Sequence, residues 1–319
     1  MSAPGDPLGG PLEGLRVLLT GATGFVGAHV LSSLLDAGAR VVAPVRRAPE
    51  GASTGVEHVV VERWTPDLLR ARLEPVAWDA VVNCAAYGVH PQRRDPAEAA
   101  AVNAVAPAIL VALAAERGAR GFVHLGTCSE YDAAAASMPL GPGAPVDTVR
   151  LYGATKLAGT ALARSGAAAH GLPFAALRLY NVYGPGEAPH RLLPAIAAGL
   201  REGTPVDLSD GLQERDWMFV GDAANAIVHV LGDLAVEEER GATLHDLCTG
   251  RATSVRDLAL LAARVLDRDP ALLRFGAIAR RPDDVPLVVG DPEPLARDHG
   301  WRAGITIEDG VQRTLLSNA

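Results

Sequence analysis

Lysine is almost absent from this chain of 319 residues, since 28 of the 29 basic residues are arginines and Lys156 is the only lysine. A composition rich in Ala, Gly, Pro and Arg is typical of GC-rich codon usage, which replaces lysine with arginine wherever either side chain will serve. Arginine cannot replace a compact, strongly hydrated ammonium group. The single lysine therefore indicates a position where the ammonium itself is needed.

Aromatic residues, cysteines and long apolar runs are also scarce. Aromatics make up 4% of the chain, so the core must be packed with Ala, Val and Leu. The three cysteines, Cys84, Cys128 and Cys248, form neither a disulfide framework nor a CxxC metal site, which fits a reducing cytoplasm. No uninterrupted apolar run approaches membrane-spanning length, and the N-terminus lacks a basic start and an apolar core. The net charge of −8 argues against nucleic acid or an anionic membrane as the main partner.

A strand, a glycine-rich turn and a helix open the folded part of the chain. The apolar run at 15–20 has strand length, and apolar residues at helical spacing follow the turn as far as Gly38. Glycines let the backbone approach a pyrophosphate, whose charge then lies at the N–H groups and positive dipole end of the helix. The turn therefore predicts a dinucleotide site at Gly21, Thr23, Gly24, Phe25, Val26 and Gly27.

The second strand, at 40–45, is followed by Arg46 and Arg47. At this point a fold that prefers NAD usually presents an acid to the ribose 2′-hydroxyl. Arginine instead binds a 2′-phosphate through charge-assisted, bidentate hydrogen bonds. The pair favours NADP(H), with NAD(H) as the alternative if both arginines are solvated loop residues. Glu62, after the third strand, is expected to reach the adenine amine.

Small and polar residues follow the next predicted strands. The fourth strand ends in Ala85 and Ala86, which suit a backbone that passes close to a cofactor. An Ala-rich helix over 97–117 carries Asn103, and the fifth strand, at 121–126, delivers Thr127. Because α/β sheets place their chemistry at the carboxyl ends of strands, the Thr127 hydroxyl is expected to face the cleft. His124 is interpreted as structural and Cys128 as a packing residue.

Tyr152 and Lys156 lie four residues apart, so on a helix they share one face. A phenol beside an ammonium is a plausible proton donor, although two ordinary surface residues have the same spacing. The alternation of strands and amphipathic helices predicts an α/β fold, a Rossmann-type doubly wound parallel sheet with a smaller mixed α/β substrate-binding lobe. The expected boundaries are a disordered lead-in at 1–12, a nucleotide domain at 13–180 with 218–248 returning to it, and the lobe at 181–217 and 249–319.

These motifs in this order resemble the extended short-chain dehydrogenase/reductase family. Within it, the chain is similar to the nucleotide-sugar branch of epimerases, 4,6-dehydratases, decarboxylases and 4-ketoreductases. The resemblance covers nearly the whole chain. It rests on Gly21-x-x-Gly24-x-x-Gly27, Asn83-x-Ala85-Ala86, Asn103, Thr127 four residues before Tyr131, Tyr152-x-x-x-Lys156, Arg178-Leu179-Tyr180-Asn181-Val182-Tyr183-Gly184-Pro185, Arg215-Asp216-Trp217 and Arg281-Pro282-Asp283-Asp284.

The resemblance implies a role for each matching residue. Tyr152 would exchange a proton with the sugar, and Thr127 would hydrogen-bond the reacting oxygen. Lys156 would hold the nicotinamide ribose and lower the pKa of Tyr152, and Asn103 would belong to the cofactor site. A nucleotide-diphosphate sugar would be the substrate, bound by Tyr87, Ser129, Asn181, Arg215 and Arg281. The family often forms homodimers, and no metal is expected.

Departures from the family pattern favour one reaction over the others. Dehydratases carry an acid, often Asp-Glu, directly after the active-site Thr, and decarboxylases place Glu where Ser129 stands. This chain has Cys128 and Ser129, with Glu130 one position too late. We therefore expect NADPH-dependent reduction of a nucleotide-linked 4-keto-(deoxy)hexose. The alternatives are a 4-epimerase with tightly bound NAD(P) and, less favoured, a non-catalytic NADP-sensing protein.

Overall fold

The computed structural model describes all residues except 1–9, 11, 49–53, 90, 91, 93, 238–240, 283 and 317–319. The chain divides into two compact units. The first contains residues 1–125, 158–176 and 227–243, and the second contains 126–157, 177–226 and 244–319. The second unit thus includes 126–157, which the sequence analysis assigned to the nucleotide domain.

The predicted lead-in at 1–12 lies mostly outside the described residues. Its last residue, Leu12, is 1% exposed and belongs to the core. The Leu15 N–H donates a hydrogen bond to the Leu12 carbonyl at 3.1 Å, which fixes Leu12 just before the first strand. Leu12 is therefore part of the fold, although the predicted lead-in included it.

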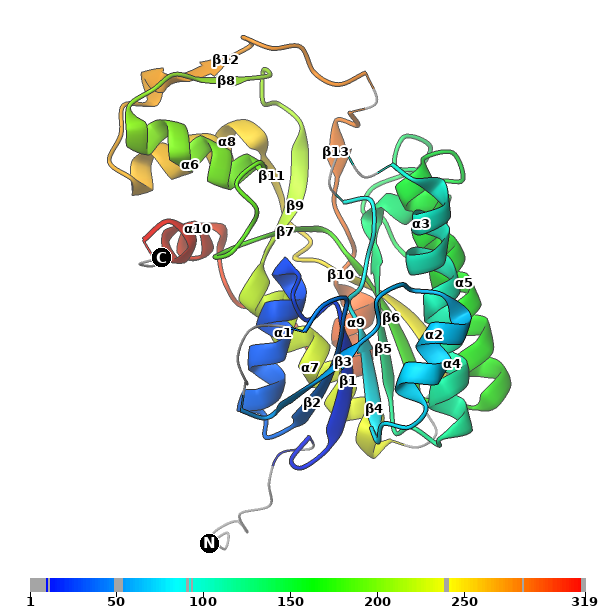
Figure 1. Cartoon of the computed structure of the whole chain (residues 1–319). Helices are drawn as coiled ribbons and strands as arrows, with labels where there is room; N and C mark the ends of the chain where they lie inside the picture. The colour runs from blue at the N-terminus through cyan, green and yellow to red at the C-terminus, as the bar shows by residue number, and fades with distance from the viewer. Residues whose placement is uncertain are drawn as a thin grey trace, which may run out of the picture. The chain divides into compact units, whose positions relative to one another are not determined.

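A seven-stranded sheet with the order β10-β6-β5-β4-β1-β2-β3 confirms the predicted doubly wound α/β architecture. Strands β1 and β4 are fully or nearly fully buried, as expected for a parallel sheet covered on both faces. In Figure 1, α1 lies on one face of the β1–β4 region, and α2 and α4 lie on the other. The elements that form or flank this sheet are β1 (Arg16–Thr20), α1 (Phe25–Asp36), β2 (Arg40–Val45), β3 (Val56–Val60), α2 (Pro66–Leu73), β4 (Ala80–Asn83), α3 (Pro96–Ala100), η1 (Ala101–Val105), α4 (Ala106–Glu116), β5 (Phe122–Thr127), α5 (Leu151–His170), β6 (Phe174–Leu179), α7 (Val220–Val236) and β10 (Ala242–Leu247).

The strand order reverses between β1 and β4. Both neighbours of β1 run parallel to it, with Arg16 beside Arg40 and Thr20 beside Asn83. In open α/β sheets, ligands bind outside the carboxyl ends of the strands at such a switch point. The glycine turn that follows β1 therefore occupies the edge of the sheet where a dinucleotide is expected.

The helix predicted over 97–117 is continuous but not uniform. It runs as α3, the π-helical turn η1 and α4, so an extra residue is accommodated around Asn103. Among the described residues, this helix from Pro96 to Glu116 is the one long and apolar enough to cross a membrane, and half of its apolar window is buried inside the fold. The sequence contains no uninterrupted run of that kind, because Glu98 and Asn103 interrupt it, but its alanines raise the mean hydropathy. A buried core helix has the same composition.

The second unit has its own small sheets and core. Strand β9 (Glu214–Phe219) pairs with β7 (Asn181–Tyr183), β11 (Ala252–Ser254) and β13 (Leu287–Val288). Strand β12 (Leu273–Phe275) pairs with β8 (Val206–Leu208). Apolar faces of α6 (Leu192–Glu202), α8 (Val255–Val265) and α10 (Ile307–Leu316) meet in one core cluster, and these helices lie together in Figure 1. The remaining short elements are η2 (Cys128–Glu130), η3 (Pro270–Leu272) and α9 (Glu293–His299).

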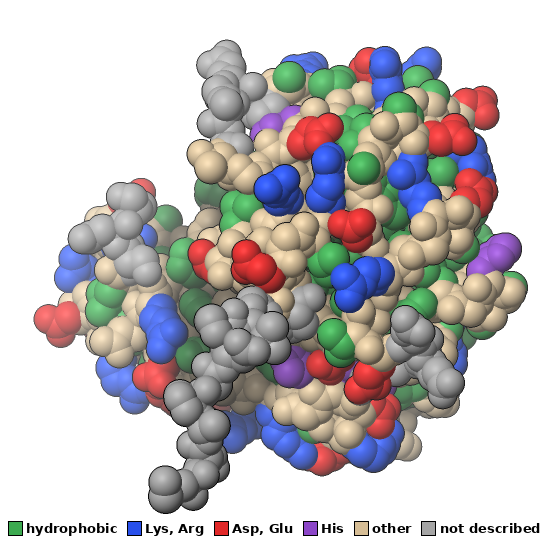
Figure 2. All heavy atoms as spheres, turned by 90° about the horizontal axis from the view of Figure 1, so that it is seen from below, with side chains coloured by type: hydrophobic (Ala, Val, Ile, Leu, Met, Phe, Trp, Pro, Cys, Tyr) green, Lys and Arg blue, Asp and Glu red, His purple; other side chains and the backbone are tan. Residues whose placement is uncertain are grey.

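The surface carries charges of both signs. On the face shown in Figure 2, Lys and Arg side chains are interspersed with Asp and Glu side chains. Elsewhere in the described residues, exposed charges form ion pairs, such as Arg302 with Glu293 at 2.7 Å and Arg70 with Glu116 at 2.8 Å. Charge on this face is mixed locally.

Candidate active site

The glycine turn after β1 is built from backbone in close contact. Gly21 has a φ of +71°, and a Cβ there would lie 2.8 Å from the backbone carbon of Cys84. A Cβ on Gly27 would lie 2.0 Å from the Gly21 carbonyl oxygen. The Gly24 N–H donates to the same oxygen at 2.9 Å. Larger residues at Gly21 or Gly27 would force the turn apart, so these glycines set its shape.

Helix α1 begins at this turn without a side-chain cap. Gly24 occupies the N-cap position, no side chain accepts a hydrogen bond from the first turn, and that turn has no acidic residue. The first N–H groups of a helix have no partners within it, and they carry its positive dipole end. Thr23 and Gly24 are exposed, and Phe25 and Val26 are half-buried. The turn therefore fits the pyrophosphate of a dinucleotide.

Buried hydrogen bonds join the residues that follow β1 and β4. The Thr20 hydroxyl donates to Asn83 Oδ1 at 2.6 Å and accepts from the Ala85 N–H at 3.2 Å. Asn83 Nδ2 lies 2.9 Å from His124 Nδ1, and both residues are buried. His124 therefore has the structural position expected for it. Ala85 is buried and Ala86 exposed, so the chain emerges at the surface just beyond the end of β4.

Asn103 holds the loop after β4. Its Oδ1 accepts from the Tyr87 N–H at 2.8 Å, and its Nδ2 donates to the Tyr87 carbonyl at 2.9 Å. A Cβ on Gly159 would lie 1.8 Å from the Asn103 carbonyl oxygen, so α5 passes very close to the π-helical turn. The Asn103 side chain is 0% exposed. The two hydrogen bonds of this buried side chain fix the Tyr87 backbone.

The residues predicted to select the adenosine half of a dinucleotide are exposed. Arg46 and Arg47 lie in a bend directly after β2, with their side chains in solvent. Glu62 is also exposed and pairs with Arg72 at 3.0 Å. A backbone hydrogen bond and, to a smaller extent, the pair with Arg72 lower the pKa of Glu62. Glu62 is therefore an ionised carboxylate on a surface loop.

A short turn after β5 carries the hydroxyl predicted to be catalytic. The Thr127 hydroxyl accepts from the Ser129 N–H at 3.2 Å, and the Thr127 N–H donates to Glu130 Oε1 at 2.9 Å. This reciprocal pattern is a capping box around η2. Thr127 is 9% exposed and Ser129 half-buried. The N–H groups of Thr127 and Ser129 thus bond side chains of the turn itself.

Tyr152 and Lys156 lie in the first two turns of α5, as predicted. Lys156 is 2% exposed and Tyr152 half-buried. Burial raises the pKa of Tyr152, and the neighbouring Cys128 and Glu130 raise it further, whereas a side-chain hydrogen bond with Thr127 lowers it. In the protein alone the pKa shift is thus opposite to the lowering expected from Lys156. The hydrogen bond brings Thr127 and Tyr152 together, so the phenol is held in its protonated form beside a hydroxyl.

Cys128 lies between these two groups in sequence but offers no reactive thiolate. Burial raises the pKa of the Cys128 thiol to about 12, and the negative charges of Asp246 and Asp216 contribute to the shift. A nucleophilic cysteine requires a lowered pKa. The interpretation of Cys128 as a packing residue agrees with this environment.

The residues predicted to bind the substrate diphosphate are in different environments. Arg215, on β9, forms an ion pair with Asp284 and donates to the Glu214 carbonyl at 2.7 Å. Arg281 is exposed, and its neighbour Arg280 pairs with Asp210. Asn181 begins β7 opposite Trp217 and is half-buried. A diphosphate would therefore have to compete with Asp284 for Arg215.

A buried polar network that the sequence did not predict lies behind the Thr127 turn. Arg178 Nε donates to Glu130 Oε2 at 2.8 Å, and the Arg178 guanidinium stacks 4.3 Å over the Tyr131 ring. The Tyr131 hydroxyl donates to Asp246 at 2.9 Å. Burial raises the pKa of Asp246 to about 7. The partners lie 48 and 115 residues apart in the chain, so no local pattern announces them.

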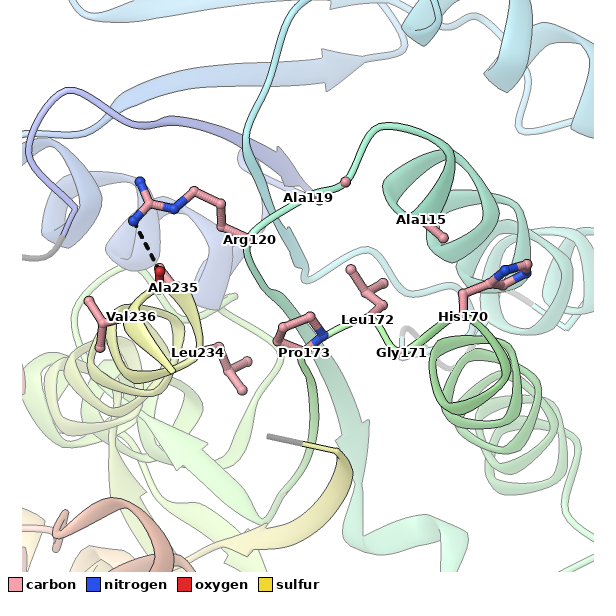
Figure 3. A pocket seen from close by; sticks show the side chains of 11 residues that line it. Ala115, Ala119, Arg120, His170, Gly171, Leu172, Pro173, Leu234, Ala235 and Val236 are labelled. Carbon is pink, nitrogen blue, oxygen red and sulfur yellow. Dashed lines mark hydrogen bonds between the residues drawn. The ribbon is translucent and has the colours of Figure 1, made fainter. Parts of the chain in front are cut away.

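A cavity of about 500 Å³ lies elsewhere in the first unit (Figure 3). It is lined by residues that precede β5 and β6 and by the end of α7, including Arg120, His170 and Leu234. Arg120 donates to the Ala235 carbonyl at 3.0 Å across it. The amino ends of the strands face this cavity, whereas ligands of such sheets bind at the carboxyl ends. Its lining contains none of the residues predicted to be catalytic.

Comparisons with known proteins agree with this geometry. The chain is 30% identical to a UDP-glucose 4-epimerase of Azospirillum brasilense, over 95% of this chain and 91% of that protein. It is 29% identical to a dTDP-6-deoxy-L-talose 4-dehydrogenase (NAD(P)(+)) of Kitasatospora kifunensis, with 93% of each covered. The solved structure of MoeE5 in complex with UDP-glucuronic acid and NAD superposes with a TM-score of 0.79 at 27% identity, covering 94% of this chain and 97% of that one. Residues 17–241 match the model of the NAD-dependent epimerase/dehydratase family, and the chain belongs to this family.

Proposed function

We propose that this enzyme reduces a nucleotide-linked 4-keto-(deoxy)hexose to the 4-hydroxy sugar with NAD(P)H, preferring NADPH, and that Tyr152 donates the proton. One observation carries the choice of reaction. Glu130, the one carboxylate between Thr127 and Tyr131, accepts hydrogen bonds from the Thr127 N–H and from Arg178. This carboxylate is therefore not available to remove a proton from the substrate, as elimination of water requires.

The chain's own residues divide the work as follows. The uncapped start of α1 binds the pyrophosphate, and Arg46 and Arg47 bind the 2′-phosphate. When bound, the nicotinamide supplies the hydride. Tyr152 gives its proton to the carbonyl oxygen, and the Thr127 hydroxyl, which accepts from the Ser129 N–H, donates its own hydrogen to that oxygen. The buried Lys156 ammonium stabilises the phenolate that remains.

A panel of dTDP-, UDP-, GDP- and CDP-linked 4-keto sugars tests this function. We expect consumption of NADPH with at least one of them and a loss of roughly 100-fold or more in Tyr152→Phe, with cofactor binding intact. A wild-type protein that binds NADPH and reduces none of these sugars would refute the ketoreductase. Equal turnover by Tyr152→Phe would mean that the phenol is not the proton donor.

The second candidate is a nucleotide-sugar 4-epimerase. The 30% identity to a UDP-glucose 4-epimerase over 95% of this chain favours it, and it would use the same Thr127, Tyr152 and Lys156. An epimerase regenerates its cofactor in each cycle. It would therefore purify with tightly bound NAD and interconvert UDP-hexoses without added reductant. A ketoreductase consumes one NAD(P)H for each sugar reduced.

A further inference from the structure

The Thr127 turn is anchored by a buried ion pair whose role neither the family match nor the proposed reaction assigns. Glu130 is 0% exposed and Arg178 is 3% exposed, and their side chains meet at 2.8 Å. Burying two charges costs solvation, and replacing such a pair with apolar residues is often no less stable. A buried pair at this position therefore invites a functional explanation.

The two oxygens of Glu130 have different partners. Oε2 accepts from Arg178 Nε, and Oε1 accepts from the Thr127 N–H at 2.9 Å. A Cβ on Gly126 would lie 2.6 Å from Oε1, so the carboxylate lies directly against the backbone that leads to Thr127. The guanidinium thus fixes the carboxylate, and the carboxylate fixes the backbone of Thr127.

Helix α5 packs on the other side of the same turn. A Cβ on Gly153 would lie 2.1 Å from the Ser129 carbonyl oxygen, and Gly153 directly follows Tyr152. The turn is therefore held between Arg178 on β6 and the first turn of α5. A change at Glu130 that moves the turn will alter the alignment of Thr127 with Tyr152.

We propose that Glu130, fixed by Arg178, is a positioning residue that aligns Thr127 with Tyr152 and whose carboxylate also acts on the phenol through its charge. The inference rests on the proposed function, in which Tyr152 is an acid. It also gives a role to the Glu130 carboxylate, which lies one position too late in the sequence to serve as the acid of a dehydratase. Glu130 acts through the turn and through its charge, without touching the substrate.

The charge effect has a definite sign. Burial is the largest cause of the raised pKa of Tyr152, and removing the Glu130 carboxylate removes one of the smaller raising contributions. The phenol should then ionise at lower pH. The groups that face it are Cys128 and Glu130 on η2, Thr127 at the end of β5, Arg191 before α6, and Lys156 on its own helix.

The test compares Glu130→Gln with Glu130→Gln/Arg178→Gln. The first variant keeps an oxygen that can accept from the Thr127 N–H but leaves the Arg178 charge uncompensated. The second removes both charges, so it guards against a failure to fold. Asp246→Asn is the matched control, because Asp246 is equally buried but bonds Tyr131. Each protein is saturated with NAD+ or NADP+, whichever binds more tightly, and labelled with ¹³C at the tyrosine Cζ, with the Tyr152 signal assigned from Tyr152→Phe.

We expect Tyr152 in Glu130→Gln to titrate roughly one pH unit or more below wild type, with an intermediate value in the double variant and no shift in Asp246→Asn. With a substrate, kcat of Glu130→Gln should fall about tenfold and the alkaline limb of its pH profile should move in step, while the cofactor Kd stays unchanged. A folded Glu130→Gln whose Tyr152 titrates as in wild type overturns the inference. A wild-type protein that reduces no 4-keto sugar would refute the proposed function. The NMR titration needs no turnover, so it would still decide whether Glu130 acts on Tyr152.

Discussion

Two turns that follow strands of the parallel sheet are built in opposite ways. The turn after β1 consists of closely packed backbone, since a Cβ on Gly27 would collide with Gly21 and a Cβ on Gly21 would collide with the Cys84 backbone. The turn after β5 is held by side chains. In its capping box, the Thr127 hydroxyl accepts a hydrogen bond from a backbone N–H of the turn, and the Glu130 carboxylate accepts one from the Thr127 N–H. The first leaves helix N–H groups open, whereas the second uses its amides internally and presents a hydroxyl.

This difference matches two kinds of recognition. Open amides at a helix start attract a diffuse negative charge and suit a pyrophosphate. A single hydroxyl, fixed by the Ser129 N–H that it accepts, has one defined direction in which to donate. A reacting carbonyl oxygen needs that directional bond. We therefore expect the first turn to lose its function when a larger side chain is introduced, and the second when a single polar group is removed.

Gly27→Ala should have the largest effect. The new methyl would lie 2.0 Å from the Gly21 carbonyl oxygen, so the turn must open and its N–H groups must move. We expect dinucleotide affinity to fall roughly 100-fold or more, about 2.7 kcal/mol, measured by fluorescence titration with NADPH and NADH. Gly143→Ala is the control, because a Cβ there meets no atom within 4 Å. Binding within twofold of wild type in Gly27→Ala would show that the close approach is not required.

Thr127→Val removes the hydroxyl on which the second turn depends. Valine has the shape of threonine but lacks the hydroxyl that accepts from the Ser129 N–H. We expect kcat to fall about 100-fold, with the stability decreasing by ~1 kcal/mol from the lost cap. Thr127→Ser keeps the hydroxyl and should retain activity within a few-fold. If Val and Ser variants turn over equally, the hydroxyl takes no part in the reaction.

Asp246→Asn tests the charge that lies behind the second turn. The pKa of Asp246 is raised from 3.8 to about 7 by burial, so the folded protein binds more protons than the unfolded chain between these values. The contribution of Asp246 to stability therefore falls as pH rises from about 4 to 7. In wild type the free energy of unfolding should decrease by a few kcal/mol, in order of magnitude, between about pH 4 and pH 7, and removing the carboxylate should abolish this decrease.

Urea unfolding at pH 5 and pH 8 measures this difference. Wild type should lose more stability between the two pH values than Asp246→Asn, in which the amide oxygen can still accept from the Tyr131 hydroxyl. The exposed Asp67 on α2 serves as a control, and Asp67→Asn should keep the wild-type pH dependence. Parallel pH dependence in wild type and Asp246→Asn would mean that Asp246 stays ionised in the folded protein.

The two turns also show what could be predicted from the sequence. The glycine turn, the strand before it and the Tyr152–Lys156 spacing are local patterns, because each depends on residues within a few positions of one another. The helix carrying Asn103 was predicted as well, but its π-helical turn was not, since it arises where Gly159 of α5 meets the Asn103 carbonyl. Contacts between helices leave no periodic signal.

The polar network behind Thr127 could not be predicted for the same reason. Glu130 was noted for its position, one residue late for a dehydratase, and its partner Arg178 was noted as part of a motif. Their pairing depends on how β5 and β6 bring residues 48 positions apart together. The family resemblance implied that Arg215 binds the substrate diphosphate, and no sequence pattern indicated that the fold pairs it with Asp284. Which charged side chains form ion pairs depends on the tertiary structure.

The smallest expected effect concerns Arg46 and Arg47, which lie in a solvent-exposed bend beyond the glycine turn. Arg46→Ala/Arg47→Ala should weaken NADPH binding about tenfold and leave NADH binding unchanged, because only the 2′-phosphate loses charge-assisted hydrogen bonds. Arg40→Ala, at the other end of β2, is the matched control and should alter neither affinity. The tenfold loss should shrink as salt is added, since exposed charges are screened. Equal loss of NADH and NADPH affinity would instead mean that the two arginines support the bend itself, and the preference for NADPH would then lack a basis in this part of the chain.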